Sequence, residues 1–488
     1  MNYHQMIKYY LLGLILNIGL LSCSPEKNQP VNPSLYWQGK ERELRYQPDG
    51  EEFVILNGDK RFTRAIYGTN SGFRFETSDF PEFGLYMPNL GGSVYMAIAT
   101  PSDTVWVNEL ESIESRFKSG QRTYLLKDSK ILGAGILTID AVALSDGEGL
   151  VVKYEARDVP EGTKLVWVYG GASNKRFSRE GDLGADPANS FFIKAENCDG
   201  NIYEIKDNHF ALYYGHSTRI ISDAEAYENP KTYKRSESAN PEILADAKRI
   251  SGIFPTGTVI RQADGNRIDS LAQLLESEKT SRPIIIAEYN LTREPFYFEL
   301  SNPVSRTDMT YADLPKAFSD GVEFRTRVAS TLKLHTPDPF MNTLGGIYSG
   351  AEDAIWEAPS YLHGAIGWRV PLTGWRAAYL GDLLGLQERA RMHFNGYINS
   401  QVTDVPVTLP PIQDKDLHLA RPAKIWGTPM YSNGYICRSP NNMPGRFSRF
   451  FRTIWLGKKT PLTRITMACM MLCAVFGRLM PSSTTEEK

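Results

Sequence analysis

Two apolar runs, Leu150-Val151-Val152-Lys153-Tyr154 and Lys164-Leu165-Val166-Trp167-Val168-Tyr169, decide the fold class of this chain. Each has the length of a strand and is rich in β-branched and aromatic residues. Similar runs recur from about residue 36 to residue 301, among them 104–107, 283–287 and 296–300, with breaks rich in Gly, Pro and Asp between them. Many short strands separated by turns predict a large antiparallel β-sandwich.

Two local signals refine this β region. The tripeptide Asn57-Gly58-Asp59 stands between the apolar segments 53–56 and 61–65, which predicts a hairpin of those two strands. Residues 271–276 instead have a helical pattern, with Asp269 or Ser270 as the N-cap.

The hydrophobic period changes to that of helices after about residue 311. Apolar stripes cover 318–332, ending near Pro337, then 340–351 after Thr336-Pro337-Asp338-Pro339, then 372–384 and 386–398. The chain is therefore expected to be a multi-domain α+β protein, in which an N-terminal antiparallel β-sandwich is followed by the beginning of an all-α domain.

The N-terminus has the pattern of an export signal. Lys8 precedes a short apolar run that ends at Leu20-Leu21-Ser22-Cys23, and the run is too short for a transmembrane helix. The last four residues resemble the bacterial lipobox, which implies that Cys23 is the lipid attachment site and that the protein is an exported bacterial lipoprotein, anchored at the outer membrane on its periplasmic or cell-surface side. The alternative is a plain cleavable signal.

Composition excludes several classes of partner and site. The chain has 54 Lys plus Arg against 56 Asp plus Glu, so it lacks the basic excess typical of a nucleic-acid partner. With seven His and no CxxC or HExxH motif, neither a metal site nor a cofactor is expected. Cys198 and Cys437, the two cysteines between the signal and the C-terminal tail, do not make a disulfide framework.

The C-terminal tail differs in composition from the rest. No Asp or Glu occurs between Asp416 and Glu486, while basic residues accumulate and 465–477 form an apolar run too short to span a bilayer. We interpret residues 442–488 as foreign to the preceding protein, the product of a frameshift or a misassembled gene end. A native amphiphilic tail is the alternative.

Short motifs in residues 336–342, 361–365 and 374–382 resemble the opening hairpins of six-hairpin glycosidases, whose helices form an (α/α)6 toroid. Together with the charged segment 169–187, they resemble Bacteroidetes lipoproteins that carry a β-supersandwich before the toroid. The resemblance implies an oligo- or polysaccharide partner and, in the full-length family, hydrolysis of glycosidic bonds by a pair of carboxyl groups acting as acid and base.

A complete ring of twelve helices needs on the order of 200 residues or more. About 105 residues follow Thr336 before the tail, so the toroid is expected to be incomplete and the chain inactive by itself. The expected divisions are a signal peptide (1–23), a tether (24–35), the β-sandwich domain (36–305), a linker helix (306–335), a partial six-hairpin domain (336–441) and the aberrant tail (442–488).

The resemblance places substrate-binding residues in the helical part, where indole rings stack on sugars and charged groups bind hydroxyls or a uronic carboxylate. The candidates are Trp356, His363, Trp368, Arg369, Trp375, Arg376 and Asp382. Trp375 also shares a helical face with Tyr379, which fits a core role, and His363 also fits loop ordering. Glu352, Asp353, Glu357 and Asp382 are the carboxylates in this region, but no catalytic pair is assigned.

Two further hypotheses remain open. A polysaccharide lyase would abstract a proton α to a uronic carboxylate, with His363, Tyr361 and Arg369 as the candidate set. A non-catalytic glycan-binding lipoprotein would use the β domain alone.

Overall fold

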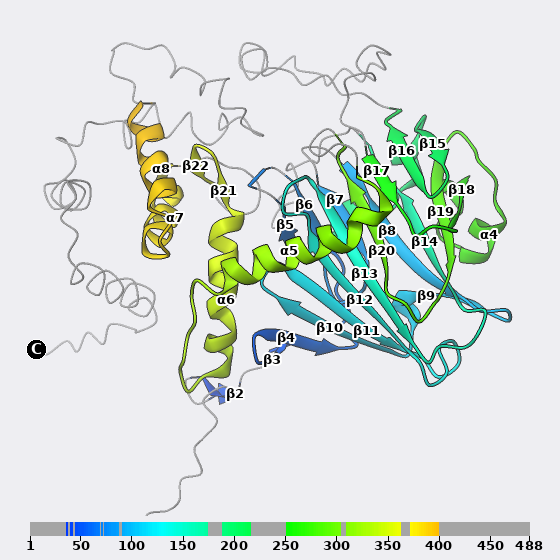
Figure 1. The fold of residues 1–488 in the computed structure, drawn as a ribbon, viewed down its shortest axis with the longest axis horizontal. Helices are drawn as coiled ribbons and strands as arrows, with labels where there is room; N and C mark the ends of the chain where they lie inside the picture. Colours follow the sequence, from blue (N-terminus) through cyan, green and yellow to red (C-terminus); the bar gives the residue numbers. More distant parts are fainter. Residues whose placement is uncertain are drawn as a thin grey trace, which may run out of the picture.

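In a computed structural model of the protein, the structure describes residues 36–399, apart from gaps at 38–39, 42–43, 69, 72, 87–89, 174–187, 216–249, 304–308 and 363–370. Two large antiparallel sheets pack face to face (Figure 1). The ten-stranded sheet has the order β15 (Ile202–Lys206), β16 (His209–Tyr213), β17 (Ile250–Ile253), β20 (Phe296–Ser301), β13 (Gly149–Arg157), β12 (Ile136–Ala143), β11 (Gln121–Lys127), β10 (Ser112–Lys118), β4 (Glu52–Leu56) and β3 (Gln47–Asp49).

The eight-stranded sheet forms the second layer. Its strands are β18 (Val259–Asp264), β19 (Pro283–Asn290), β14 (Lys164–Gly170), β8 (Leu90–Ala99), β7 (Phe83–Tyr86), β6 (Arg74–Thr77) and β5 (Arg64–Tyr67), with β9 (Thr104–Trp106) paired to β8. Two small hairpins join β1 (Tyr36–Trp37) to β2 (Lys40–Glu41) and β21 (Trp356–Glu357) to β22 (Ser360–Tyr361). The predicted antiparallel sandwich is therefore present.

The core between the sheets is built on aromatic rings. Trp167 of β14 is fully buried, and its Nε1 donates a hydrogen bond of 2.8 Å to the Tyr154 hydroxyl of β13. The Tyr154 ring stacks on Phe296 of β20, with 5.1 Å between ring centroids. The two runs that predicted the fold thus face each other across the sandwich, one from each sheet.

The hairpin predicted around Asn57-Gly58-Asp59 is wrong. β4 pairs with β3 and β10 in one sheet, whereas β5 pairs with β6 in the other. Asn57 has a positive φ of 49°, and its side-chain oxygen accepts a hydrogen bond from the Ile113 amide of β10. The tripeptide therefore turns the chain from one layer to the next, because burial of Ile66 in the second sheet outweighs the local turn preference.

The predicted helices are present with small shifts. α4 (Leu271–Glu276) lies beside β18, and Ser270 is its N-cap residue, without a side-chain capping bond. α5 (Leu314–Ala329) packs on the outer face of the ten-stranded sheet against β12, β13 and β20 (Figure 1). α5 ends before Leu332, which was expected in the same stripe. Short 3-10 turns are η1 (Val107–Glu109), η2 (Ala188–Phe191), η3 (Ala195–Cys198), η4 (Gly265–Arg267) and η5 (Tyr311–Asp313).

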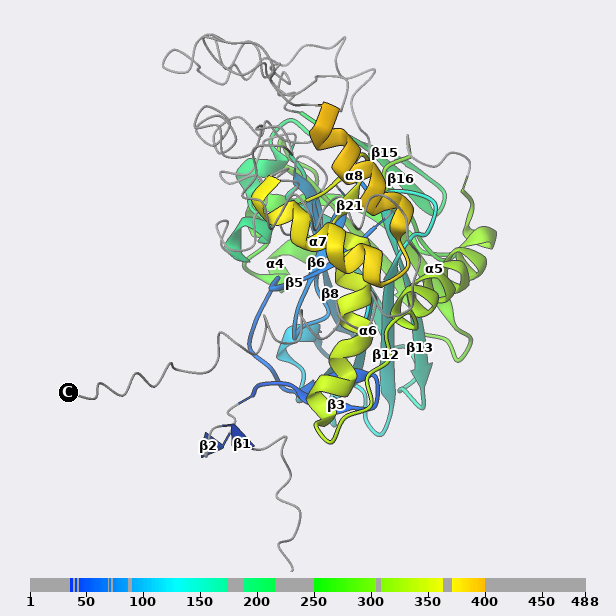
Figure 2. The same ribbon diagram turned by 90° about the vertical axis from the view of Figure 1, so that its left-hand side faces the viewer.

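Three more helices follow α5. α6 (Pro339–Ala354) begins at the N-cap Asp338, whose carboxylate accepts a hydrogen bond from the Phe340 amide, as Thr336-Pro337-Asp338-Pro339 predicted. α6 contacts α5 and β3, while α7 (Pro371–Leu383) and α8 (Gln387–Asn399) pack on each other and on β22 (Figure 2). The described residues contain these helices but no closed ring, so a toroid is not established.

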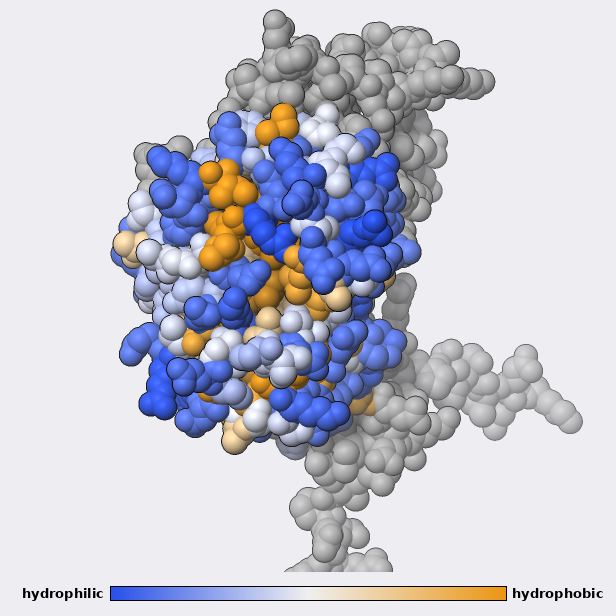
Figure 3. All heavy atoms as spheres, turned by 90° about the vertical axis from the view of Figure 1, so that its right-hand side faces the viewer, coloured by the Kyte–Doolittle hydropathy of each residue, from blue (hydrophilic) through white to orange (hydrophobic). Residues whose placement is uncertain are grey.

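The edges of both sheets reach the surface on the face that carries β15, β18 and α4. Figure 3 shows an apolar stripe across this face. The exposed large apolar side chains of the two edge strands are Ile202, Ile205 and Val259. Among the described helices, none has the length and apolar character needed to cross a membrane.

Candidate functional site

The structure describes only part of the predicted site. Trp356 lies in β21 and is buried, and Asp382 lies half-buried near the end of α7. Trp375 and Arg376 belong to α7, but their side chains are outside the described part. His363, Trp368, Arg369 and Cys23, the predicted lipid attachment site, lie outside the described residues, as does the tail 442–488.

Trp356 belongs to a packed group that joins α6, the β21–β22 hairpin and α8. Its ring meets Tyr361 of β22 at 4.8 Å between centroids, and the Arg389 guanidinium of α8 lies 5.7 Å from the indole centroid. The Tyr361 amide donates a 3.1 Å hydrogen bond to Nδ1 of the buried His393. We call this group, with Glu352 and Asp353 of α6, the junction cluster. In it Trp356 serves as core, with 6% of its surface exposed.

Asp353 carries the ion pairs of the junction cluster. Arg389 Nη1 donates to its Oδ1 at 2.9 Å, and Arg325 of α5 lies 3.9 Å from its Oδ2. Asn70, in the loop after β5, donates from Nδ2 to the Asp353 carbonyl at 2.9 Å and receives a bond from Arg389. These contacts connect α5, α6 and α8 with the loop that follows β5 of the eight-stranded sheet. Burial lowers the pKa of Arg325 to about 10, against the attraction of Asp353.

Glu352, the preceding residue, has different surroundings from Asp353. Adjacent helical residues point about 100° apart, so its carboxyl group faces Tyr361 and Gly381 rather than the arginines. Burial raises the pKa of Glu352 to about 8, and the Tyr361 hydroxyl and Arg389 oppose this rise only in part. Its Oε1 has no hydrogen-bond partner of normal geometry among the described residues. Glu352 is therefore mostly protonated at pH 7.

Glycoside hydrolysis requires a protonated carboxyl group and a second, ionised one on either side of the scissile bond. In this chain, however, Glu352 is 2% exposed and Asp353 6% exposed. Tyr361, a member of the candidate set for the lyase hypothesis, is fully buried, and burial raises its pKa, which disfavours proton abstraction. The described residues of the junction cluster are therefore buried and pack against one another.

An open cleft of about 680 Å³ lies between α5 and the outer face of the ten-stranded sheet. Its volume is in the range of small-ligand sites. The strands contribute Lys153 and Tyr297 to its wall, and the other side is formed by α5 and its C-cap. The residues on the α5 side are Pro315, Phe318, Ser319, Val322, Glu323, Thr326, Arg327 and Ser330.

The cleft combines aromatic and polar groups. The rings of Tyr297 and Phe318 are 5.9 Å apart and tilted by 61°, and both are half-buried. Lys153 forms an ion pair with Glu155. Burial alone would lower the pKa of Lys153, but the ion pair with Glu155 outweighs burial and raises it. Aromatic faces next to charged and hydroxyl groups suit a ligand that has both apolar and polar faces.

The sequence reasoning missed this cleft. The alternation along β20 was a usable signal, because Phe296 and Phe298 point into the core and Tyr297 therefore points outward. The apolar stripe predicted for this helix also included Phe318 and Val322, which pack beside Ala317 on the ten-stranded sheet. What could not be foreseen is that α5 covers β13 and β20, which brings Tyr297 and Phe318 together.

The chain is similar to a protein family of unknown function and, weakly, to a solved glucoamylase structure. Residues 87–322, which span most of the sandwich and the first part of α5, match the family described as Domain of unknown function (DUF4450). A bacterial glucoamylase solved in complex with acarbose is similar with a TM-score of 0.36 and 13% identity, covering 71% of this chain and 53% of the glucoamylase. The chain thus spans about half the length of that enzyme. No curated protein matches the chain.

Proposed function

We propose that this protein is a glycoside hydrolase-like protein that binds oligo- or polysaccharide in the cleft between α5 and the ten-stranded sheet. The observation that carries the proposal is the composition of the cleft wall: the Tyr297 and Phe318 rings stand next to Lys153, Arg327 and hydroxyl side chains. A pyranose has an apolar C–H face that can stack on a ring and hydroxyls that can bond to the flanking polar groups.

We propose binding without turnover. Hydrolysis needs two carboxyl groups on either side of the scissile bond. Among the described residues of the cleft wall, Glu323 is the carboxylate, and Glu352 and Asp353 are buried in the junction cluster. The sequence resemblance to six-hairpin glycosidases supports a carbohydrate ligand.

The test is a binding titration of the full chain with oligosaccharides, using neutral α-glucans, neutral β-glucans and uronate-containing fragments. Tyr297→Ala removes the outward ring from the cleft and should weaken binding by about tenfold or more, equivalent to about 1.4 kcal/mol. Tyr348→Ala is the matched control, because Tyr348 is 44% exposed on α6 and is not part of the cleft wall.

Reducing-end release should be measured on the same samples. If none of the oligosaccharides binds, or if Tyr297→Ala binds like the wild type, the proposed site is wrong. If the purified chain releases reducing ends, and Glu352→Gln abolishes the release, binding without turnover is wrong.

We also propose that Cys23 is lipidated and anchors the protein at the outer membrane. The segment Leu20-Leu21-Ser22-Cys23 supports this through its resemblance to a lipobox. Labelling with radioactive palmitate in a bacterial host should mark the wild type and the control Cys437→Ser, and should not mark Cys23→Ser. Equal labelling of all three proteins would refute the proposal.

A further inference from the structure

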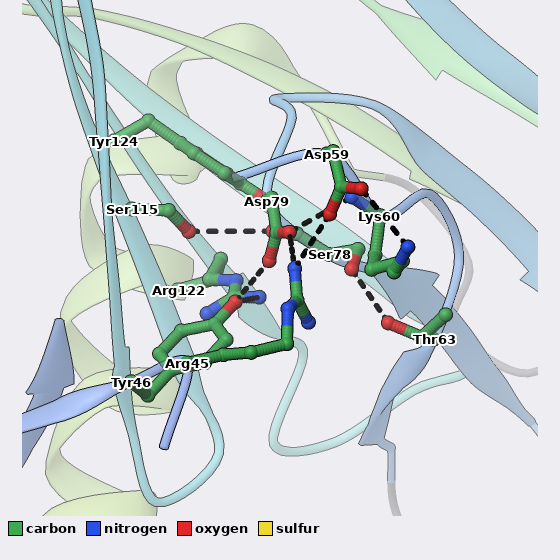
Figure 4. Close-up of polar contacts among 10 residues, drawn as sticks. All are labelled: Arg45, Tyr46, Asp59, Lys60, Thr63, Ser78, Asp79, Ser115, Arg122 and Tyr124. Carbon is green, nitrogen blue, oxygen red and sulfur yellow. Dashed lines mark hydrogen bonds and ion pairs between the residues drawn. The ribbon is translucent and has the colours of Figure 1, made fainter. Parts of the chain in front are cut away.

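A second polar cluster lies around Asp79, in the loop that follows β6 (Figure 4). At its centre is the fully buried carboxylate of Asp79, which accepts hydrogen bonds from the Arg45 guanidinium, the Tyr46 hydroxyl and, at 2.8 Å, the Lys60 amide. Gly58 lies against this carboxylate so closely that a Cβ would overlap it. We call the group of Arg45, Tyr46, Lys60, Arg64, Asp79 and Arg122 the edge cluster.

Hydrogen bonds of Ser78 fix the loop that carries Asp79. The carbonyl of the neighbouring Ser78 accepts hydrogen bonds from the Tyr124 hydroxyl at 2.9 Å and from the Ser115 hydroxyl at 3.3 Å (Figure 4). The Ser78 hydroxyl lies 2.6 Å from the Thr63 hydroxyl. The edge cluster is therefore preorganised by both sheets.

Arginines outnumber carboxylates in the edge cluster. Three guanidinium groups surround the Tyr46 ring, at 5.9 Å for Arg45, 5.7 Å for Arg64 and 5.7 Å for Arg122. With Lys60 they make four cations, whereas the acidic groups are Asp79 and the exposed Asp59, which pairs with Arg45 and Lys60. The local excess is therefore two positive charges.

Two of these arginines have unused donors. Arg122 is 1% exposed and donates from Nη2 to the Tyr46 hydroxyl at 3.1 Å, but its Nε and Nη1 have no hydrogen-bond partner among the described residues. The Arg64 guanidinium, over the Phe117 ring at 5.1 Å, has neither a hydrogen bond nor an ion pair within the described part of the chain. Partial burial and the charge of Arg122 lower the pKa of Arg64.

We propose that the edge cluster is a binding site for an oxyanion, a carboxylate or sulfate group, held by Arg64 and Arg45 at the surface. A guanidinium group binds such oxygens with two parallel hydrogen bonds, and Arg64 is an exposed residue with all of its donors free within the described part. The bound anion would compensate the excess charge, including that of Arg122 below it. If the proposed function holds, the anion is the acidic group of a uronate or sulfated sugar.

The test is calorimetric titration of the full chain with sodium sulfate, D-glucuronate and D-glucose at constant chloride concentration. Wild type should bind an anion and not glucose, and Arg64→Gln should weaken anion binding at least tenfold. Arg64→Lys should bind with intermediate affinity, because it keeps the charge and loses the planar fork. Arg267→Gln is the matched control, since Arg267 is an exposed arginine paired with Asp264 outside the cluster.

The outcomes of this titration distinguish failure of the oxyanion site from failure of the proposed function. Binding of sulfate but not glucuronate would assign the site to a free inorganic anion and refute the acidic sugar. Anion binding that depends on Arg64, in a protein that binds no oligosaccharide, would leave the site standing and refute the proposed function. If neither anion binds, or if folded Arg64→Gln and Arg64→Lys both bind like the wild type, the oxyanion site is wrong.

Discussion

The buried carboxyl group of Glu352 predicts a specific dependence of stability on pH. Its pKa is about 8 in the folded protein against 4.5 for an ordinary Glu. Between these values the folded protein holds a proton that the unfolded chain releases, so raising the pH favours unfolding. The contribution of Glu352 is fully present below about pH 4.5 and is lost as the pH rises toward about 8.

The size of the effect follows from the two pKa values. Each pH unit inside this window costs about 1.4 kcal/mol, so the full window corresponds to about 5 kcal/mol, and the interval from pH 5 to pH 7 to about 2.5 kcal/mol. Because Glu352 is 2% exposed, solvent screening reduces this figure little.

Glu352→Gln removes the titration while keeping the shape of the side chain. Denaturant unfolding of both proteins at pH 5, 6, 7 and 8 should show the variant gaining stability relative to wild type as the pH rises, by about 2.5 kcal/mol between pH 5 and 7. The control is Glu388→Gln, whose carboxylate is 66% exposed and pairs with Arg391. A difference between Glu352→Gln and wild type that does not change with pH would refute the argument that burial governs this group.

Two further substitutions test the packing described above. Asp353→Asn leaves Arg325 buried without its countercharge and should destabilise the protein by about 3 kcal/mol or more, whereas Asp320→Asn, in an exposed pair on α5, should change the unfolding free energy by less than about 1 kcal/mol. Tyr154→Phe leaves the Trp167 indole N–H without an acceptor and should cost about 1–3 kcal/mol in denaturant unfolding, and no loss would show that this bond adds nothing to the core.

Local sequence patterns predicted most of the secondary structure. The strand runs 150–154, 164–169, 283–287 and 296–300 lie within β13, β14, β19 and β20, and the helix beginning at Asp338 was predicted from its cap. These predictions succeeded because side-chain period, β-branching and capping are properties of neighbouring residues. The antiparallel sandwich follows from many such runs in succession.

The sites depended on contacts between distant segments. The cleft exists because α5 lies on β13 and β20, which puts Phe318 beside Tyr297. The edge cluster joins Arg45, Asp79 and Arg122, and the NGD tripeptide that favoured a hairpin instead carries the chain between sheets.

The surroundings of Glu352 and Asp353 show the same division between what the sequence determined and what the tertiary structure decided. Glu352 and Asp353 are neighbours with the same acidic chemistry, so the sequence by itself determined only that two carboxyl groups would stand on one helix, about 100° apart. The tertiary structure decided their different contacts: α8 and the loop after β5 bring Arg389 and Asn70 to Asp353, whereas Glu352 lies beside Tyr361 of β22, where burial raises its pKa to about 8. Burial depends on contacts between distant segments, and it raises the pKa of Glu352.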